Sequence, residues 1–133
     1  MNRMALSIAV SVLAAGCATQ VARLKDETPL SRYQPYVGTP IDHFTAFRLD
    51  SWESVGPNQV VIWTGVNEAY LITVWDHCRN LDFAQHIAVT STAHTVSKMD
   101  SLRVEWDSCP IESIRPIDIT RYKEDRAALR EKT

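Results

Sequence analysis

Residues 59–75 have the sequence QVVIWTGVNEAYLITVW, and this stretch decides the fold. Two runs rich in valine, isoleucine, threonine and aromatic residues, 59–64 and 69–75, flank the turn-forming residues 65–68. Such residues favour extended backbone, and a short glycine-containing turn between two extended runs is typical of a β-hairpin. We therefore predict an antiparallel hairpin over residues 59–75.

The residues before the hairpin continue the strand and turn pattern. Gly56-Pro57-Asn58 predicts a turn, and the partial alternation of apolar and polar residues over 44–52 predicts a strand before it. We expect the folded domain to begin near Ile41. Residues 18–39 contain charged residues and prolines with few regularly spaced apolar positions, which is typical of a tether.

After the hairpin the pattern changes and then returns to strands. Residues 76–84 are small and polar and leave room for one helical turn, whereas 86–92, 102–106 and 111–119 predict three further strands. Pro116 lacks the N–H that a central strand would donate, so the last strand is expected at a sheet edge or with a break. We predict a mainly β fold of five or six antiparallel strands, arranged as a small barrel or sandwich.

Composition limits the size and the partners of this fold. The chain has 133 residues, of which 45% are hydrophobic and 23% charged, and its formal net charge is −2. These values suit one folded domain, and the acidic balance gives no electropositive surface for phosphates. Nucleic acid is therefore not an expected partner.

The first sixteen residues predict an export signal. Residues 1–3 carry a positive charge, residues 4–13 are apolar apart from Ser7 and Ser11, and residues 14–16 are small. The apolar stretch is shorter than the roughly 20 residues that a membrane-spanning helix needs. We expect it to be cleaved.

The end of this signal, Leu13-Ala14-Ala15-Gly16-Cys17, resembles the lipobox of bacterial lipoproteins. The resemblance implies that the Cys17 thiol is diacylated, that the signal is cut before Cys17, and that the new amino end is acylated as well, as with palmitate. Ala18 in place of aspartate resembles lipoproteins destined for the outer membrane. The alternative is an ordinary secretory signal that yields a free periplasmic protein.

These predictions divide the chain into four segments. They are the signal peptide (1–16), the lipidated cysteine and tether (17–40), the β-rich domain (41–119), and a charged tail or short C-terminal helix (120–133). The expected location is the bacterial cell envelope, lipid-anchored to the outer membrane and facing the periplasm.

With Cys17 assigned to lipid, Cys78 and Cys109 form an even set in a compartment that permits disulfides. We predict that they pair, closing a loop of about 30 residues worth roughly 3 to 4 kcal/mol in the chain-entropy account. The alternative is a metal site made of His77, Cys78 and Cys109 with His86 or His94. Its ligand spacing does not match that of zinc sites, and we predict no metal and no cofactor.

The body of the chain also resembles a family of short bacterial lipoproteins that carry a domain of unknown function. The resemblance covers most of residues 41–118 and implies the anchor and the disulfide, without an activity or a ligand. It is carried by Ala69-Tyr70-Leu71, Cys78 with Leu81, Ile87, and Cys109-Pro110-Ile111 with Ile114.

Four tryptophans fall on predicted strands, which is many for so small a domain. Core filling is the favoured interpretation, since each aromatic side chain buries about 150 to 250 Å². In the alternative, Trp63 and Trp75 form an exposed patch at the outer end of the hairpin that binds a sugar, a peptide or a protein. The four are Trp52, Trp63, Trp75 and Trp106.

No catalytic residue is predicted. Four histidines (His43, His77, His86 and His94) and four serines (Ser91, Ser97, Ser101 and Ser108) supply candidate bases and nucleophiles, but no nucleophile, zinc-helix or phosphate-loop motif organises them. We expect a tethered binding or interaction module, with the membrane and an envelope protein as partners. The alternatives are a small hydrolase or metal-dependent enzyme, and a structural envelope component.

Overall fold

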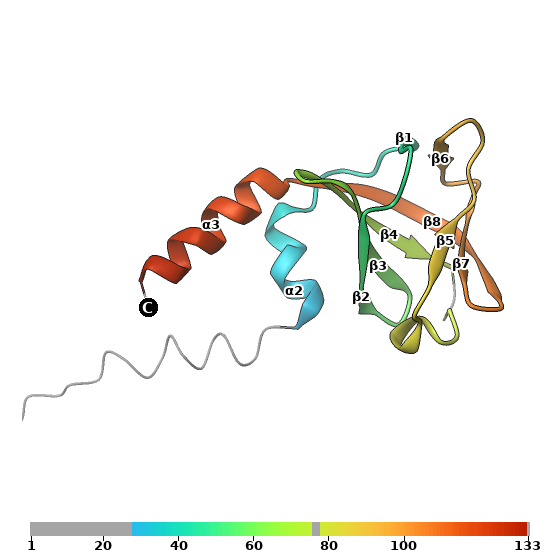
Figure 1. Cartoon of the computed structure of the whole chain (residues 1–133), viewed down its shortest axis with the longest axis horizontal. Coiled ribbons are helices and arrows are strands. Elements are labelled where there is room, and N and C mark those ends of the chain that lie inside the picture. Colours follow the sequence, from blue (N-terminus) through green and yellow to red (C-terminus); the bar gives the residue numbers. More distant parts are fainter. Residues whose placement is uncertain (1–27, 76–77, 133) are drawn as a thin grey trace, which may run out of the picture.

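The computed structural model describes residues 28–75 and 78–132; Cys17 and His77 lie outside this range. The chain is mainly β, with eight described strands in two antiparallel sheets and helical elements at both ends (Figure 1). Six strands form a curled half-barrel in the order β2-β3-β4-β8-β7-β5, and β1 pairs with β6. The predicted fold class is confirmed. The elements are α2 (Pro29–Tyr33), η1 (Gln34–Tyr36), β1 (His43–Thr45), β2 (Ser51–Gly56), β3 (Gln59–Gly65), β4 (Glu68–Val74), η2 (Leu81–Phe83), β5 (Ile87–Val89), β6 (Thr95–Ser97), β7 (Ser101–Val104), β8 (Asp107–Ile117) and α3 (Ile119–Glu131).

Strands β3 and β4 form the predicted hairpin, called here the central hairpin (residues 59–74). Ile62 lies opposite Tyr70, and the chain reverses at residues 66–67. The predicted turn after Gly56 is also confirmed, since β2 and β3 pair on either side of residues 57–58. Two turns and two strands therefore follow directly from the residues that favour them.

The central hairpin is covered on both faces. Val60 and Ile62 belong to one buried cluster, while Val61 belongs to a second, and all three side chains are 0% exposed. Neighbouring residues of a strand point to opposite faces, so a strand buried on both faces needs a continuous apolar run. The Val60-Val61-Ile62 run is the consequence.

The first cluster fills the space between the curled sheet, the small sheet and η2. Phe44 of β1 stacks on Tyr70 with ring centroids 4.2 Å apart, and Leu81 of η2 is 1% exposed. The predicted single strand over 44–52 is wrong. Strand β1 ends at Thr45, and the next residue, Ala46, donates its N–H to the carbonyl of His94. The chain then crosses to the six-stranded sheet, and β2 begins after Asp50, whose N–H donates to the carbonyl of Trp63.

The second cluster covers the outer face of the sheet with the N-terminal helical segment and the start of α3. Tyr33 is 3% exposed, and its hydroxyl donates to Glu53 of β2 at 2.6 Å. Thr28 caps α2, and Pro29 occupies its first turn. The prediction of a tether up to residue 40 is therefore wrong, because the fold already includes residue 28. A threonine followed by a proline, as in Thr28-Pro29, is a typical start of a helix.

Strand β8 lies inside the sheet order, but at Pro116 only its β4 side pairs with a strand, so the expectation of an edge holds at this position. Strand β8 pairs with β4 over residues 111–117, but β7 covers only residues 107–110. The carbonyl of Pro116 accepts from Gly38 N–H at 2.8 Å, so its nitrogen faces the 37–41 segment and not β4. The missing donor thus falls on the side of β8 where the sheet needs none.

The predicted disulfide between Cys78 and Cys109 is confirmed, with Cα atoms 5.9 Å apart. Both cysteines are buried in the first cluster and join the segment before η2 to β8. Their sulfurs are bonded to each other, so neither is a thiolate ligand. The described residues contain no group of three His, Cys, Asp or Glu side chains placed to hold a metal ion.

Asp118 caps the C-terminal helix α3, because its side chain accepts from the Arg121 N–H. Ile119 is buried and Tyr122 packs on the second cluster, after which the helix runs away from the sheet (Figure 1). Within residues 28–75 and 78–132, no helix combines the length and apolar character that crossing a membrane requires.

Candidate functional site

The core-filling interpretation holds for only two of the four tryptophans. Trp52 packs half-buried on the first cluster and Trp63 on the second, whereas Trp75 is 58% exposed and Trp106 is 94% exposed. Branched aliphatic residues fill most of the interior.

The alternative patch of Trp63 and Trp75 is not formed either. Trp63 lies opposite Ala69 at one end of the central hairpin. Trp75 follows Val74 at the other end, where Val74 N–H donates to the carbonyl of Asn58. The two indoles therefore lie at opposite ends of the hairpin.

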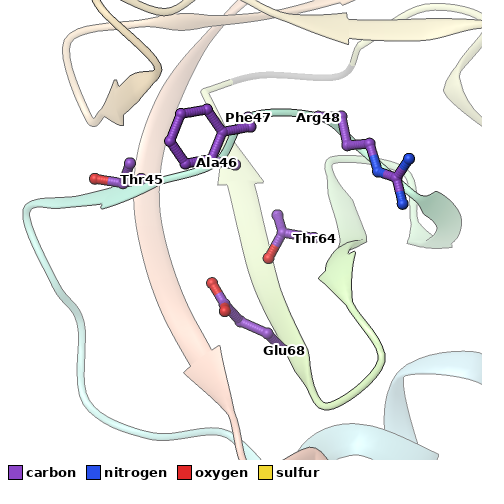
Figure 2. Close-up of a pocket in the computed structure, with 6 residues that line it drawn as sticks. All are labelled: Thr45, Ala46, Phe47, Arg48, Thr64 and Glu68. Carbon is purple, nitrogen blue, oxygen red and sulfur yellow. The ribbon is translucent and has the colours of Figure 1, made fainter.

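A different part of the surface provides a ligand-sized depression, called here the hollow. Its volume is about 400 Å³, and it lies between the segment that crosses from β1 to β2 and the turn of the central hairpin (Figure 2). Its lining residues are Thr45, Ala46, Phe47, Arg48, Thr64 and Glu68.

A β-bulge places Thr64 in the hollow. The pairing of β3 with β4 passes from Trp63 opposite Ala69 directly to Gly65 opposite Glu68, so Thr64 is the extra residue. A bulge redirects the side chain of the extra residue, and bulges are frequent beside binding sites. In Figure 2 the Thr64 hydroxyl and the Glu68 carboxylate point toward the same space.

The charge facing the hollow is that of Glu68. Its Oε1 accepts from the Tyr70 hydroxyl at 2.7 Å. Burial, followed by this bond and the nearby carboxylate charge, raises the pKa of Tyr70 to about 12, so the phenol remains a donor at neutral pH. Arg48 extends away from the hollow in Figure 2, and its Nε lies 2.9 Å from Asp50. A positive group is therefore favoured inside.

The hydroxyl of Thr64 lacks a hydrogen-bond partner. Its Oγ1 is buried and has no partner among the described residues. An unpaired buried polar group costs about 1 to 3 kcal/mol, and nearly all such groups in native proteins are paired. This hydroxyl lies beneath the surface of the hollow, beside the Glu68 carboxylate.

An exposed aromatic side chain forms the outer wall of the hollow. Phe47 is 83% exposed, and its ring centroid lies 5.0 Å from that of His94. His94 belongs to a tight turn in which Ala93 and His94 have φ values of 49° and 63°, as in a type I′ turn. The turn is fixed by the Ala46 N–H, which donates to the carbonyl of His94 at 2.9 Å.

The candidate bases and nucleophiles are distributed over separate positions. His43 lies opposite Ser97 in the small sheet, and the Ser97 hydroxyl bonds to Asp100. His86 is exposed beside Glu105, and His94 packs on Phe47. In the described part of the chain no candidate serine is hydrogen-bonded to a candidate histidine, and His77 lies outside it.

The hollow was missed by sequence analysis. Phe47 and Arg48 lie within the predicted strand 44–52, where an aromatic residue is common and does not indicate a binding site. The bulge at Thr64 could not be seen, because pairing register depends on the partner strand. The one sequence feature that indicates the hollow is Glu68, a charged residue in the predicted turn 65–68.

The fold and the hollow together define a small, disulfide-bonded β domain with an open depression on its surface. The chain belongs to DUF6491, a family of unknown function, whose sequence model matches residues 1–133. The expected membership in a family of unknown function is thereby confirmed. Comparisons with curated proteins and with solved structures gave no match.

Proposed function

We propose that this chain is a lipid-anchored binding module of a bacterial cell envelope, and that its hollow binds a small ligand carrying an amine cation. The observation that carries the binding role is the exposed Glu68 carboxylate, which lines the hollow together with the exposed ring of Phe47. A cation bound there would form a charge-assisted hydrogen bond with Glu68 and pack on the ring.

The ligand class follows from two groups that line the hollow. Glu68 attracts a positive charge, and charge-assisted hydrogen bonds are about twice as strong as neutral ones. The face of Phe47 offers a favourable contact to a cation or to the alkyl chain that carries it. An alkylammonium group satisfies both.

The anchor is supported by the N-terminal sequence and by the disulfide. Multiple acyl chains on Cys17, at about 0.8 kcal/mol for each buried CH₂, exceed what stable membrane attachment requires. The Cys78–Cys109 bond fits an oxidising compartment such as the periplasm. Ala18 after the lipidated cysteine favours the outer membrane.

Binding is tested by titrating the protein with n-butylammonium and with the neutral analogue 1-butanol, followed by amide chemical shifts. We expect the ammonium ion to shift residues 45–48 and 64–68 and 1-butanol to bind at least tenfold more weakly. Glu68→Gln keeps an oxygen for Tyr70 but removes the charge, and should weaken ammonium binding about tenfold, or about 1.4 kcal/mol. Glu112→Gln, at an exposed position of β8, is the matched control.

Equal affinity of Glu68→Gln and Glu112→Gln for n-butylammonium would refute the binding proposal. The anchor is tested separately, by mass spectrometry of the N-terminal peptide and by the Cys17→Ser variant. Acylated Cys17 and loss of membrane partitioning in Cys17→Ser are expected; a variant that still partitions fully with membranes would refute the anchor.

A further inference from the structure

Two side chains outside the hollow expose nearly their whole aromatic surface. Trp106, in the turn between β7 and β8, is 94% exposed, and Phe83, at the end of η2, is 87% exposed. Single exposed apolar residues are common on protein surfaces, but neighbouring ones mark contact surfaces. Phe83 and Trp106 would mark such a surface if they are neighbours.

Hydrogen bonds place the two loops side by side. Glu105 Oε1 accepts from the backbone N–H of Gln85 at 3.1 Å and of His86 at 3.4 Å. Gln85 is two residues from Phe83, and Glu105 directly precedes Trp106. Phe83 and Trp106 thus stand on adjoining loops, and we name them the aromatic edge.

The loop that carries Phe83 is held firmly. Leu81 anchors η2 in the core at 1% exposure, and the Asp82 carboxylate accepts from the Ser54 hydroxyl at 3.0 Å. The Cys78–Cys109 disulfide fixes the segment before η2. The exposed ring of Phe83 is therefore presented by a fixed support and not by a loose loop.

The turn that carries Trp106 breaks local rules of hairpin construction. Glu105 has a φ of 53° at a position where such turns favour glycine, asparagine or aspartate. The Oδ2 of Asp107 is buried without a partner among the described residues. A large exposed indole, an unfavourable φ and an unpaired carboxylate oxygen coincide in three consecutive residues. Such strain is concentrated at functional positions.

We propose that the aromatic edge docks on the lipid surface of the membrane that carries the anchor; this inference rests on the anchor of the proposed function. Trp favours the membrane interface, where its ring is buried and its N–H stays wet, and Phe buries its ring at the same boundary. Ten residues lie between Cys17 and Thr28, and the eleven Cα–Cα steps span at most about 40 Å even when fully extended. The tether therefore keeps the domain close enough for direct contact.

The arrangement of the domain agrees with this orientation. In Figure 1 the Thr28 end of α2, η2 and the β7–β8 turn all lie at the lower side of the domain. The tether and the aromatic edge can thus approach one surface together. Charges near the edge have mixed sign, with Arg79 and Arg103 beside Asp82 and Glu105, so the contact should depend on apolar burial and not on salt.

The test uses the acylated mature protein, which begins at Cys17. It is placed in phosphatidylethanolamine and phosphatidylglycerol vesicles, with and without brominated acyl chains that quench tryptophan fluorescence. Subtracting the spectrum of Trp106→Phe isolates the emission of Trp106. We expect bromination to reduce this emission at least twofold, equally in low and high salt. The half-buried Trp52, isolated in the same way through Trp52→Phe, is the matched control and should be unaffected.

Unchanged Trp106 emission with acylated Cys17 would overturn the lipid contact alone and leave a protein partner as the occupant of the edge. Unacylated Cys17, found by mass spectrometry of the same sample, would overturn the anchor and the inference together. Quenching that disappears in high salt would also contradict the apolar contact. Phe83→Ser should lower the quenching of Trp106, because one of the two inserted rings is removed.

Discussion

The central hairpin and the loops that surround it follow opposite rules. In the hairpin, local preference, pairing and burial agree, and residues such as Val60, Ile62 and Ile72 are 0% exposed. The surrounding loops, called here the loop rim, comprise residues 46–50, 92–95, 98–100 and 104–107. They contain three non-glycine residues with positive φ, namely Ala93, His94 and Glu105.

The difference shows that stability and strain are divided in this small domain. A position with unfavourable φ or an unpaired polar atom costs on the order of 1 to 3 kcal/mol and persists only where the surrounding structure dictates it. The central hairpin supplies that constraint. The rim can therefore hold His94 beside the hollow and Glu105 beside Trp106 in conformations that these residues do not favour.

The largest expected effect is in the hairpin itself. Ile72→Ala removes a side chain that is 0% exposed in the first cluster, and should lower the free energy of unfolding by about 3 to 5 kcal/mol. Urea denaturation measures the change. Ile87→Ala, at a half-buried position of the edge strand β5, is the control and should cost less than half as much. Equal costs would remove the distinction between centre and periphery.

A smaller effect is expected where the N-terminal segment joins the sheet. Tyr33→Phe removes a buried hydroxyl that donates to the Glu53 carboxylate, and should cost about 1.5 to 2 kcal/mol. The same denaturation experiment applies. A change below about 0.5 kcal/mol would indicate that residues 28–40 are a tether and not part of the fold.

Thr64 lies where the hairpin meets the rim, and its substitution should stabilise the protein. Thr64→Val keeps the shape and removes the unpartnered hydroxyl, so the free energy of unfolding should rise by about 1 kcal/mol. Thermal unfolding measures the change. Stability that falls instead would mean that the hydroxyl is paired in solution.

The smallest effect is pH-dependent and belongs to the rim. Hydrogen bonds from the Ser97 backbone N–H, and then from the Thr90 and Ser97 hydroxyls, outweigh burial and lower the pKa of Asp100. A folded pKa below the unfolded one adds stability above the unfolded pKa of about 4, and this stability is lost as pH falls toward the folded pKa.

Asp100→Asn should therefore reduce stability at pH 7 by about 1 kcal/mol or less and leave it nearly unchanged near pH 2. Urea midpoints at the two pH values measure the difference. A variant that loses equal stability at both would show that the carboxylate charge contributes nothing.

Sequence reasoning succeeded where one physical term dominates. Branched apolar runs and turn residues predicted the central hairpin, and the even pair Cys78 and Cys109 predicted the disulfide. It failed where the outcome depends on distant partners. The exposure of Trp106, the bulge at Thr64 and the packing of residues 37–41 beside Pro116 are all set by register and by neighbouring segments that local pattern does not contain.

Native-state hydrogen exchange tests the division between hairpin and rim most directly. The amides of Ile62 and Ile72 should exchange only through global unfolding, with the full unfolding free energy. The amides of Ala46 and Thr95, although hydrogen-bonded in the rim, should exchange at a free energy at least about 3 kcal/mol lower. Equal protection of all four amides would show that rim and hairpin form one cooperative unit, and would contradict the account.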